Sequence, residues 1–132
     1  EIMPYLIVKD AQKSIDFYQK AFGFELLNKV ADDKDNIQHV EMRRGEIVIM
    51  FCTESACESM GMKTKSPISE GIEEAMTLYC YCEDVDAFHD NAVKHGAKSH
   101  TEPTDQFWGD RMCTILDPDH YRWSFATFLG ER

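Results

Sequence analysis

The sequence predicts an α+β domain made of two copies of one strand–helix–strand–strand–strand unit, whose sheets form an open half-barrel cleft. The same order of strand-like and helix-like segments occurs twice in the 132 residues. The residues that start the two helices, Asp10 and Asp84, are 74 positions apart, and the glycines that end them, Gly23 and Gly96, are 73 apart. One helix covers one face of each predicted sheet, so the other face is left to line the cleft.

The first module is expected at about residues 1–52. Its helix begins at Asp10, a favourable N-cap residue, and ends at Gly23, which suits a left-handed C-terminal stop. The strands are apolar runs bounded by turn residues, and the last two form a hairpin that turns near Arg44 and Gly45. The expected elements are a strand over 2–8, a helix over 10–23, and strands over 24–30, 36–44 and 45–52.

A linker is expected at about residues 53–74. Its Ser, Gly, Lys and Pro content is typical of a mobile loop, and loops of this length are often lids or binding segments. Met60 and Met62 could form a soft lid over an apolar ligand. Packing of these two side chains in a dimer is an equally good interpretation.

The second module is expected at about residues 75–128. In its last strand Trp123 and Phe125 alternate with Arg122, Ser124 and Ala126. Alternation places the two large rings under the helix and the other three side chains toward the cleft, where the small ones leave room for a ligand. The expected elements are a strand over 74–82, a helix over 84–96, and strands over 98–103, 110–116 and 120–128.

Charge and cysteine content narrow the function classes. The net charge of −10 disfavours binding to nucleic acid or to an anionic membrane, and no apolar run is long enough to span a bilayer. The chain shows no signal-peptide pattern at its start. Five cysteines without a CxxC pair indicate reduced thiols rather than a disulfide framework or a zinc ribbon. These features predict a cytoplasmic protein.

Three stretches carry a family resemblance: PYLIVKDAQKSIDFYQKAFGFEL, HVEMRRGEIVIMF and WGDRMCTILDPDHYRWSFAT. They resemble the vicinal oxygen chelate superfamily, which includes glyoxalase I, bleomycin-resistance proteins and extradiol dioxygenases. The last stretch is most similar to the PhnB-like subgroup, although His120 stands where that subgroup usually has Gly. The resemblance implies a single domain over residues 1–132 and a homodimer.

The resemblance also implies positions for a divalent metal, one on each of four strands facing the cleft. These positions fall at Met3, Glu41, Thr77 and Ser124. Only Glu41 is a plausible ligand, and one carboxylate cannot hold a hard divalent ion against water. We therefore predict no metal and no other cofactor. The alternative is a non-standard metal site that contains His39, Glu41 and further ligands that the sequence does not identify.

Several side chains are expected to line a ligand site on the cleft faces. Glu41 could act as a general base or recognise a cationic group, or it could instead form a salt bridge with Arg43 or Arg122. The aromatic members suit a flat or amphipathic small molecule, with ordinary core packing as the competing interpretation. The candidate ligand-binding residues are Tyr5, His39, Glu41, Tyr79, Tyr81, Trp108, Arg122 and Ser124.

Two functional hypotheses follow from these residues. The favoured one is a metal-independent protein that binds a small molecule in an aromatic cleft, similar to the bleomycin-resistance branch. The other is a metal-dependent enzyme of the glyoxalase or dioxygenase type. The sequence leaves open whether any reaction is catalysed, and Glu41 is the catalytic candidate if one is.

Overall fold

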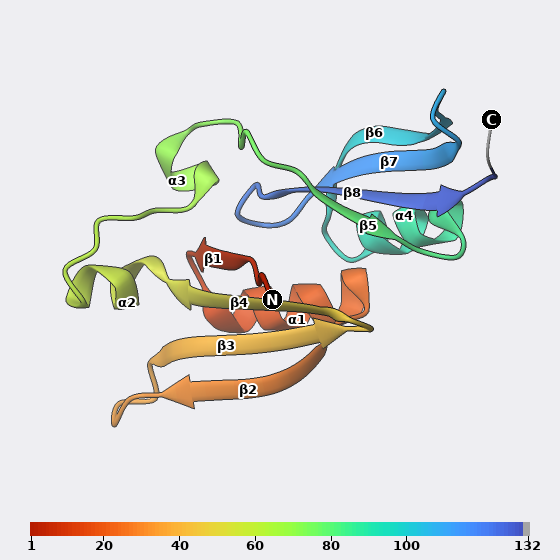
Figure 1. Cartoon of the computed structure of the whole chain (residues 1–132). Helices are drawn as coiled ribbons and strands as arrows, with labels where there is room; N and C mark the ends of the chain where they lie inside the picture. Colours follow the sequence, from red (N-terminus) through yellow and green to blue (C-terminus); the bar gives the residue numbers. More distant parts are fainter. Residues whose placement is uncertain (131–132) are drawn as a thin grey trace. The chain divides into compact units, whose positions relative to one another are not determined.

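The computed structural model describes residues 1–130 and divides the chain into two compact units, with the boundary between Ile72 and Glu73. Each unit holds a four-stranded sheet with a helix on one face (Figure 1). The first unit contains β1 (Tyr5–Val8), α1 (Ala11–Phe22), β2 (Glu25–Ala31), β3 (Ile37–Arg44), β4 (Ile47–Thr53), α2 (Glu54–Ser59) and α3 (Pro67–Glu70). The second contains β5 (Leu78–Tyr81), α4 (Val85–Lys94), β6 (Lys98–Asp105), β7 (Asp110–Leu116) and β8 (Arg122–Phe128).

The two sheets have the same topology. Their strand orders are β1-β4-β3-β2 and β5-β8-β7-β6, with the first pair of each parallel and the other pairs antiparallel. Even the register corresponds, since Tyr5 lies opposite Met50 in one sheet and Tyr79 lies opposite Ser124 in the other. This confirms the predicted α+β class and the repeated module, while the cleft between modules stays a prediction.

In the first unit, α1 forms where the sequence predicts it. The Asp10 side chain accepts a hydrogen bond from the Lys13 amide, and Gly23 ends the helix with φ 73°. Its buried face packs on one side of the sheet through rings such as Tyr18 and Phe22, which contact each other edge to face. The opposite side of the sheet is therefore left for other contacts.

In the second unit, α4 covers the corresponding face. Asp84 caps it by accepting from the Ala87 amide. The rings of Phe88 and Phe125 lie 4.0 Å apart between centroids, and Trp123 stacks on Phe125. Trp123 and Phe125 are buried, as the alternation in the last strand predicts. None of the helices within residues 1–130 has the length and apolar character needed to cross a membrane.

The linker contains two short helices, α2 and α3, that the sequence prediction of a loop did not include. Thr53 caps α2 by accepting from the Ala56 amide. Glu54 then accepts hydrogen bonds from the amide and hydroxyl of Ser66 and from the hydroxyl of Ser69, which fixes the start of α3. The Glu54 carboxylate, twelve residues before Ser66, accepts the hydrogen bonds at the start of this helix. No local sequence pattern predicts such a contact.

The strand expected to end at Pro103 continues to Asp105. β6 lies at the edge of its sheet, and its pairing with β7 shifts register between Thr101 and Thr104. Proline is tolerated at an edge or a bulge because no ladder hydrogen bond is lost there. The predicted end of this strand at Pro103 is therefore wrong. The sequence of one strand does not show whether that strand lies at the edge of its sheet, where proline is tolerated.

Candidate functional site

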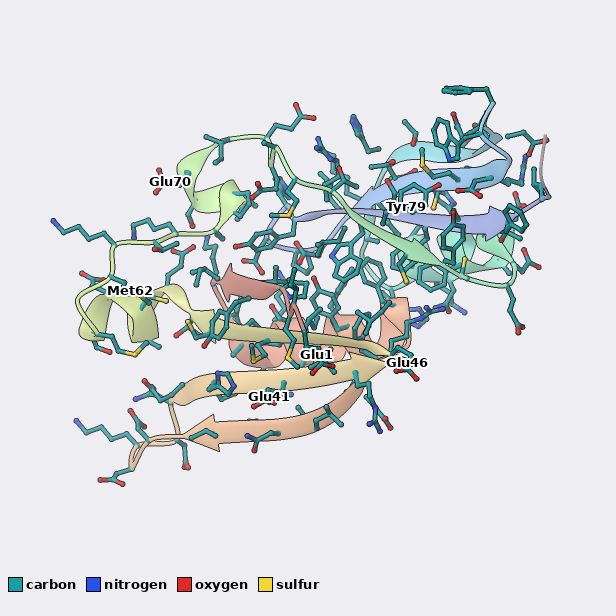
Figure 2. The ribbon with its side chains drawn as sticks, in the orientation of Figure 1. Glu1, Glu41, Glu46, Met62, Glu70 and Tyr79 are labelled. Atoms are coloured by element: carbon teal, nitrogen blue, oxygen red, sulfur yellow. The ribbon has the colours of Figure 1, made fainter. Side chains whose placement is uncertain are left out.

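The first unit brings three predicted site residues together on the sheet face opposite α1. The Tyr5 hydroxyl lies 2.9 Å from His39 Nδ1, and His39 Nε2 lies 2.9 Å from a Glu41 carboxylate oxygen. β1 supplies the phenol, and β3 supplies the other two at alternate positions, so all three share a face. Figure 2 shows Glu41 on β3 within this sheet. We call Tyr5, His39 and Glu41 the histidine cluster.

The histidine cluster is partly open to solvent. The side chains of His39 and Glu41 are 27% and 33% exposed. Burial raises the pKa of Tyr5 to about 12, with further contributions from the neighbouring Cys52 and Cys57 thiols and from Glu41. The phenol therefore stays protonated near neutral pH and can donate a hydrogen bond. A phenol, an imidazole and a carboxylate in series can hold a polar ligand group or move a proton.

The interpretation of Glu41 as a salt-bridge partner of Arg43 is wrong. Glu41 is bonded to His39, whereas Arg43 forms a two-nitrogen contact with Glu25 on the adjacent strand β2. Arg122 is held by groups of its own unit. Sequence reasoning missed the histidine partner because it treated His39 and Glu41 as possible metal ligands rather than as partners of each other.

The second unit places a carboxylate inside an aromatic group, again on the face away from its helix. One oxygen of Asp110 accepts hydrogen bonds from the Tyr79 hydroxyl at 2.5 Å, the Tyr81 hydroxyl at 2.9 Å and the Trp108 indole at 3.0 Å. The indole nitrogen also lies 3.1 Å from the Tyr79 hydroxyl. We call Asp110, Tyr79, Tyr81 and Trp108 the aspartate cluster; Tyr79 is marked on β5 in Figure 2.

The aspartate cluster combines a buried anion with exposed rings. Asp110 is 1% exposed, whereas Tyr79, Tyr81 and Trp108 are 42%, 55% and 45% exposed. The hydrogen bond from Tyr79, followed by those from Tyr81 and Trp108, holds the pKa of Asp110 below its ordinary value. The carboxylate is thus ionised at neutral pH beneath a surface of aromatic rings, an arrangement that suits a positively charged or flat amphipathic molecule.

Local sequence explains how the aspartate cluster forms. Tyr79 and Tyr81 alternate along β5 and therefore point the same way. Asp110 begins β7, and the turn before it passes through Gly109 at φ 98°, which lets Trp108 fold back onto the carboxylate. Sequence reasoning named the three rings but missed Asp110, although the closely spaced Trp-Gly-Asp was a usable signal.

Two other predicted site residues have their polar groups engaged within the second unit. Arg122 Nε donates to the Thr77 hydroxyl at 2.6 Å, and its other nitrogens contact Glu73 and the Ala75 carbonyl. Ser124 is buried, and its hydroxyl lies 2.9 Å from that of Thr114. Arg122 therefore fastens the chain before β5, and the Ser124 hydroxyl is already satisfied.

The residues present do not fit the metal site that the resemblance implies. In register, the counterpart of Ser124 is Met50, while Glu41 corresponds to Thr114 on the adjacent strand. At the implied positions, Met3, Thr77 and Ser124 offer no strong ligand for a hard divalent ion. Within residues 1–130, no three His, Cys, Asp or Glu side chains are grouped closely enough to hold a metal. His39 and Glu41 contribute two donors at most.

A separate hollow of about 250 Å³ lies in the first unit, between α2 and the segment that follows it. Its lining includes Met62, one of the two methionines considered as a lid, and it contains no member of either cluster. The lining residues are Glu54, Glu58, Gly61, Met62, Lys63, Thr64 and Lys65. Long flexible side chains form most of this wall, and the carboxylate of Glu54 is already engaged by Ser66 and Ser69.

Comparisons with known proteins agree with this fold. The chain is 33% identical over 130 residues to an uncharacterised protein of Mycobacterium bovis, covering 98% of this chain and 84% of the relative. A glyoxalase-related enzyme from Fulvimarina pelagi superposes with a TM-score of 0.75 at 17% identity, over 96% of this chain and 87% of that one.

A third similar structure is the fosfomycin resistance protein FosX of Listeria monocytogenes, in a variant complexed with Mn(II) and a dihydroxypropylphosphonic acid. Its TM-score is 0.70 at 15% identity, over 94% of this chain and 86% of that one. At such identities these structures support the fold alone. The model of one family, however, matches residues 2–125. The chain therefore belongs to the Glyoxalase/Bleomycin resistance protein/Dioxygenase superfamily.

Proposed function

We propose that the protein binds a small, flat and positively charged or amphipathic molecule on the aspartate cluster, without a metal. The observation that carries this proposal is the ionised Asp110 carboxylate held beneath three half-exposed rings. Hydrogen bonding to Asp110 fixes the tyrosine and indole orientations before a ligand arrives. Such preorganisation reduces the entropy lost on binding.

The chemistry of these groups favours a cation. Aromatic faces attract positive charge through their quadrupole, with a strength of about 0.5–2 kcal/mol per contact depending on desolvation. The nearby carboxylate adds a Coulombic attraction, and the net charge of −10 favours the approach of cationic molecules over anionic ones. An anionic ligand would meet unfavourable electrostatics both at a distance and at the site.

A planar aromatic dye provides the direct test. Proflavine, which is cationic at neutral pH, should raise the melting temperature of the protein, whereas an anionic dye of similar size should not. Tyr81→Ala should weaken proflavine binding about tenfold in a calorimetric titration, because a ring contact is lost. Tyr5→Ala is the matched control from the histidine cluster and should bind as the native protein does. Equal weakening by both variants would move the site away from the aspartate cluster.

A catalytic role is the second candidate, and one observation favours it. In the histidine cluster, Glu41 and Tyr5 bond the two ring nitrogens of His39, which orients the imidazole as a general acid or base would require. The FosX relative was crystallised with Mn(II), which makes a metal-dependent reaction the natural alternative. This chain would need donors beyond His39 and Glu41 to hold such an ion.

Metal analysis separates the two candidates. We expect protein purified without chelator to contain much less than one equivalent of manganese, iron, nickel or zinc, and dialysis against a chelator to leave proflavine binding unchanged. One bound equivalent that Glu41→Gln removes would favour the enzyme. Glu41→Asn is a suitable second variant. Like Glu41→Gln it removes the charge, and it also shortens the side chain.

We also infer that the protein is a cytoplasmic homodimer of the PhnB-like subgroup. The reduced cysteines support a reducing compartment. The edge strand β2 supports self-association, because its apolar side chains Leu26, Leu27 and Val30 are all exposed. The Trp-Gly-Asp-Arg stretch that resembles the subgroup includes Trp108 and Asp110, two members of the aspartate cluster.

A further inference from the structure

Two thiols lie in direct contact within the first unit. The sulfur atoms of Cys52 and Cys57 are 2.9 Å apart, and both residues are fully buried. They pack with Ile7 and Ala56 in a small apolar cluster between β1, β4 and α2. Both cysteines are free, as the sequence predicts. Neither thiol belongs to the aspartate cluster or is needed for the proposed binding.

Local structure creates this contact. Cys52 is the penultimate residue of β4, and the chain turns directly into α2 at Thr53, whose side chain caps the new helix. The first turn of α2 then brings Cys57 back over the end of the strand. The strand therefore leads directly into a capped helix, and only four residues separate the two cysteines in the sequence.

We propose that Cys52 and Cys57 are an oxidisable pair that low-molecular-weight disulfides convert to an intrachain disulfide. One thiol loses its proton and attacks the reagent, which releases one thiolate and leaves a mixed disulfide on the protein. The second protein thiolate then attacks the protein sulfur of that mixed disulfide and releases the second reagent thiolate. The protein loses two protons and two electrons, and the reagent is reduced to two thiols.

The required movement is small. A disulfide has a sulfur separation near 2.0 Å, so the two sulfur atoms must approach by roughly 1 Å. Access is the slower step, because both thiols are buried and the reagent must wait for α2 to open. Burial, together with the neighbouring Cys57 thiol, raises the pKa of Cys52 to about 12. Oxidation should therefore be slow at neutral pH and faster in alkali.

Oxidation should also reach the histidine cluster. The Cys52 and Cys57 thiols are among the groups that raise the Tyr5 pKa, and the disulfide removes both. The bond would also link α2 covalently to the end of β4. β4 is the strand that pairs with β1, and its Met50 lies opposite Tyr5. The Tyr5 phenol is the group whose titration should change.

The test equilibrates the native chain with buffers of oxidised and reduced glutathione, followed by acid quenching, alkylation and tryptic digestion. Both cysteines lie in the tryptic peptide 45–63, because the flanking cleavage sites are Arg44 and Lys63. The bridged peptide should appear unalkylated and lighter by two hydrogen atoms. The peptide 66–94, which carries Cys80 and Cys82, is the internal control and should remain fully alkylated.

Comparison with the unfolded chain shows whether the fold favours the bond. At one glutathione ratio, the equilibrium constant for the bridge should be about tenfold higher in native buffer than in concentrated urea, because the fold holds the sulfurs together. Cys57→Ser should abolish the bridged peptide, whereas Cys113→Ser, which alters another buried thiol, should leave it unchanged. A native constant equal to or below that in urea would overturn the proposal, as would equal bridging in the peptide 66–94.

Discussion

Asp110 organises the aromatic surface of the second unit at the level of single atoms. One carboxylate oxygen accepts from two phenols and an indole, which come from β5 and from the turn before β7. A charged acceptor forms stronger hydrogen bonds than a neutral one. The rings can therefore be half exposed and still have fixed orientations, which ordinary packing would not give to exposed side chains.

The phenol donors to Asp110 should stabilise the fold, and because they share one oxygen their contributions should be coupled. Tyr79→Phe deletes the shortest bond to the carboxylate and should lower the free energy of unfolding by about 1 kcal/mol. Tyr81→Phe should cost less, because its bond is longer and its ring is more exposed. Urea unfolding of both single variants and the double variant measures the coupling between them. Strict additivity would show that the two phenols do not share one acceptor.

Tyrosine titration tests both clusters at once. Burial raises the pKa of Tyr5 and of Tyr79 from the ordinary value of 10.0 to about 12. A group with a raised folded-state pKa stabilises the fold below its unfolded-state pKa. That contribution should disappear as the pH rises from about 10 to about 12.

Two measurements check this alkaline loss. Near-ultraviolet absorbance should show a late-titrating phenolate that is missing in Tyr5→Phe and another that is missing in Tyr79→Phe. The slope of unfolding free energy against pH should be shallower in each variant above pH 10. An unchanged absorbance titration in both variants would contradict the burial of the two phenols.

Elements with local signals were predictable from the sequence. Asp10 and Asp84 cap their helices through amides three residues ahead, so the signal and the contact lie in one short segment. α2 and α3 were missed because each is very short, and α3 starts at a distant carboxylate. Pro103 also misled the prediction, because an edge strand can accept proline at a bulge.

The clusters were predictable only in part. Alternation along a strand identifies which side chains share a face, so Tyr79 with Tyr81 and His39 with Glu41 could be paired. Partners across strands depend on register and turn geometry, which hid both Asp110 and the contact between Tyr5 and His39. For the same reason Ser124 looked available, although a hydroxyl on the adjacent strand already satisfies it.

The turn before β7 depends on one glycine. Gly109 has φ 98°, and an added Cβ would lie 2.5 Å from the Gly130 carbonyl oxygen. Gly109→Ala should therefore lower the free energy of unfolding by roughly 1–3 kcal/mol and displace Trp108 from Asp110. Gly45→Ala, at φ 58° with open space around it, is the control and should cost less. Denaturant unfolding with tryptophan fluorescence reads both effects, and equal losses would rule out the steric contact.

At the scale of the whole molecule, one scaffold is used twice with different chemistry. Tyr5 and Tyr79 occupy equivalent positions. Tyr5 lies on β1 and pairs with β4, and Tyr79 lies on β5 and pairs with β8. Around the first lie an imidazole and a carboxylate from β3, and around the second lie a phenol, an indole and a carboxylate from β5, β7 and its preceding turn. A repeated fold thus fixes the position of the phenols, while the residues around them determine what each face can bind.

Self-association is expected through β2, which is exposed along its whole length at the edge of its sheet. An edge strand with unpaired backbone groups and exposed Leu26, Leu27 and Val30 favours pairing with a second copy. Sedimentation equilibrium should therefore give twice the chain mass of 15.3 kDa. Leu27→Glu should shift the equilibrium toward the monomer, because it places a charge in the apolar contact.

The control for this prediction is Val93→Glu, which makes the same kind of change at an exposed apolar residue of α4. Its sedimentation should match that of the native chain, because β2 itself is left unchanged. If Leu27→Glu remained a dimer, the interface would lie outside β2. If the native chain sedimented as a monomer, the prediction of a dimer would be wrong. Because the two variants carry the same added charge, any difference between them reports the position of the contact rather than the increased net repulsion.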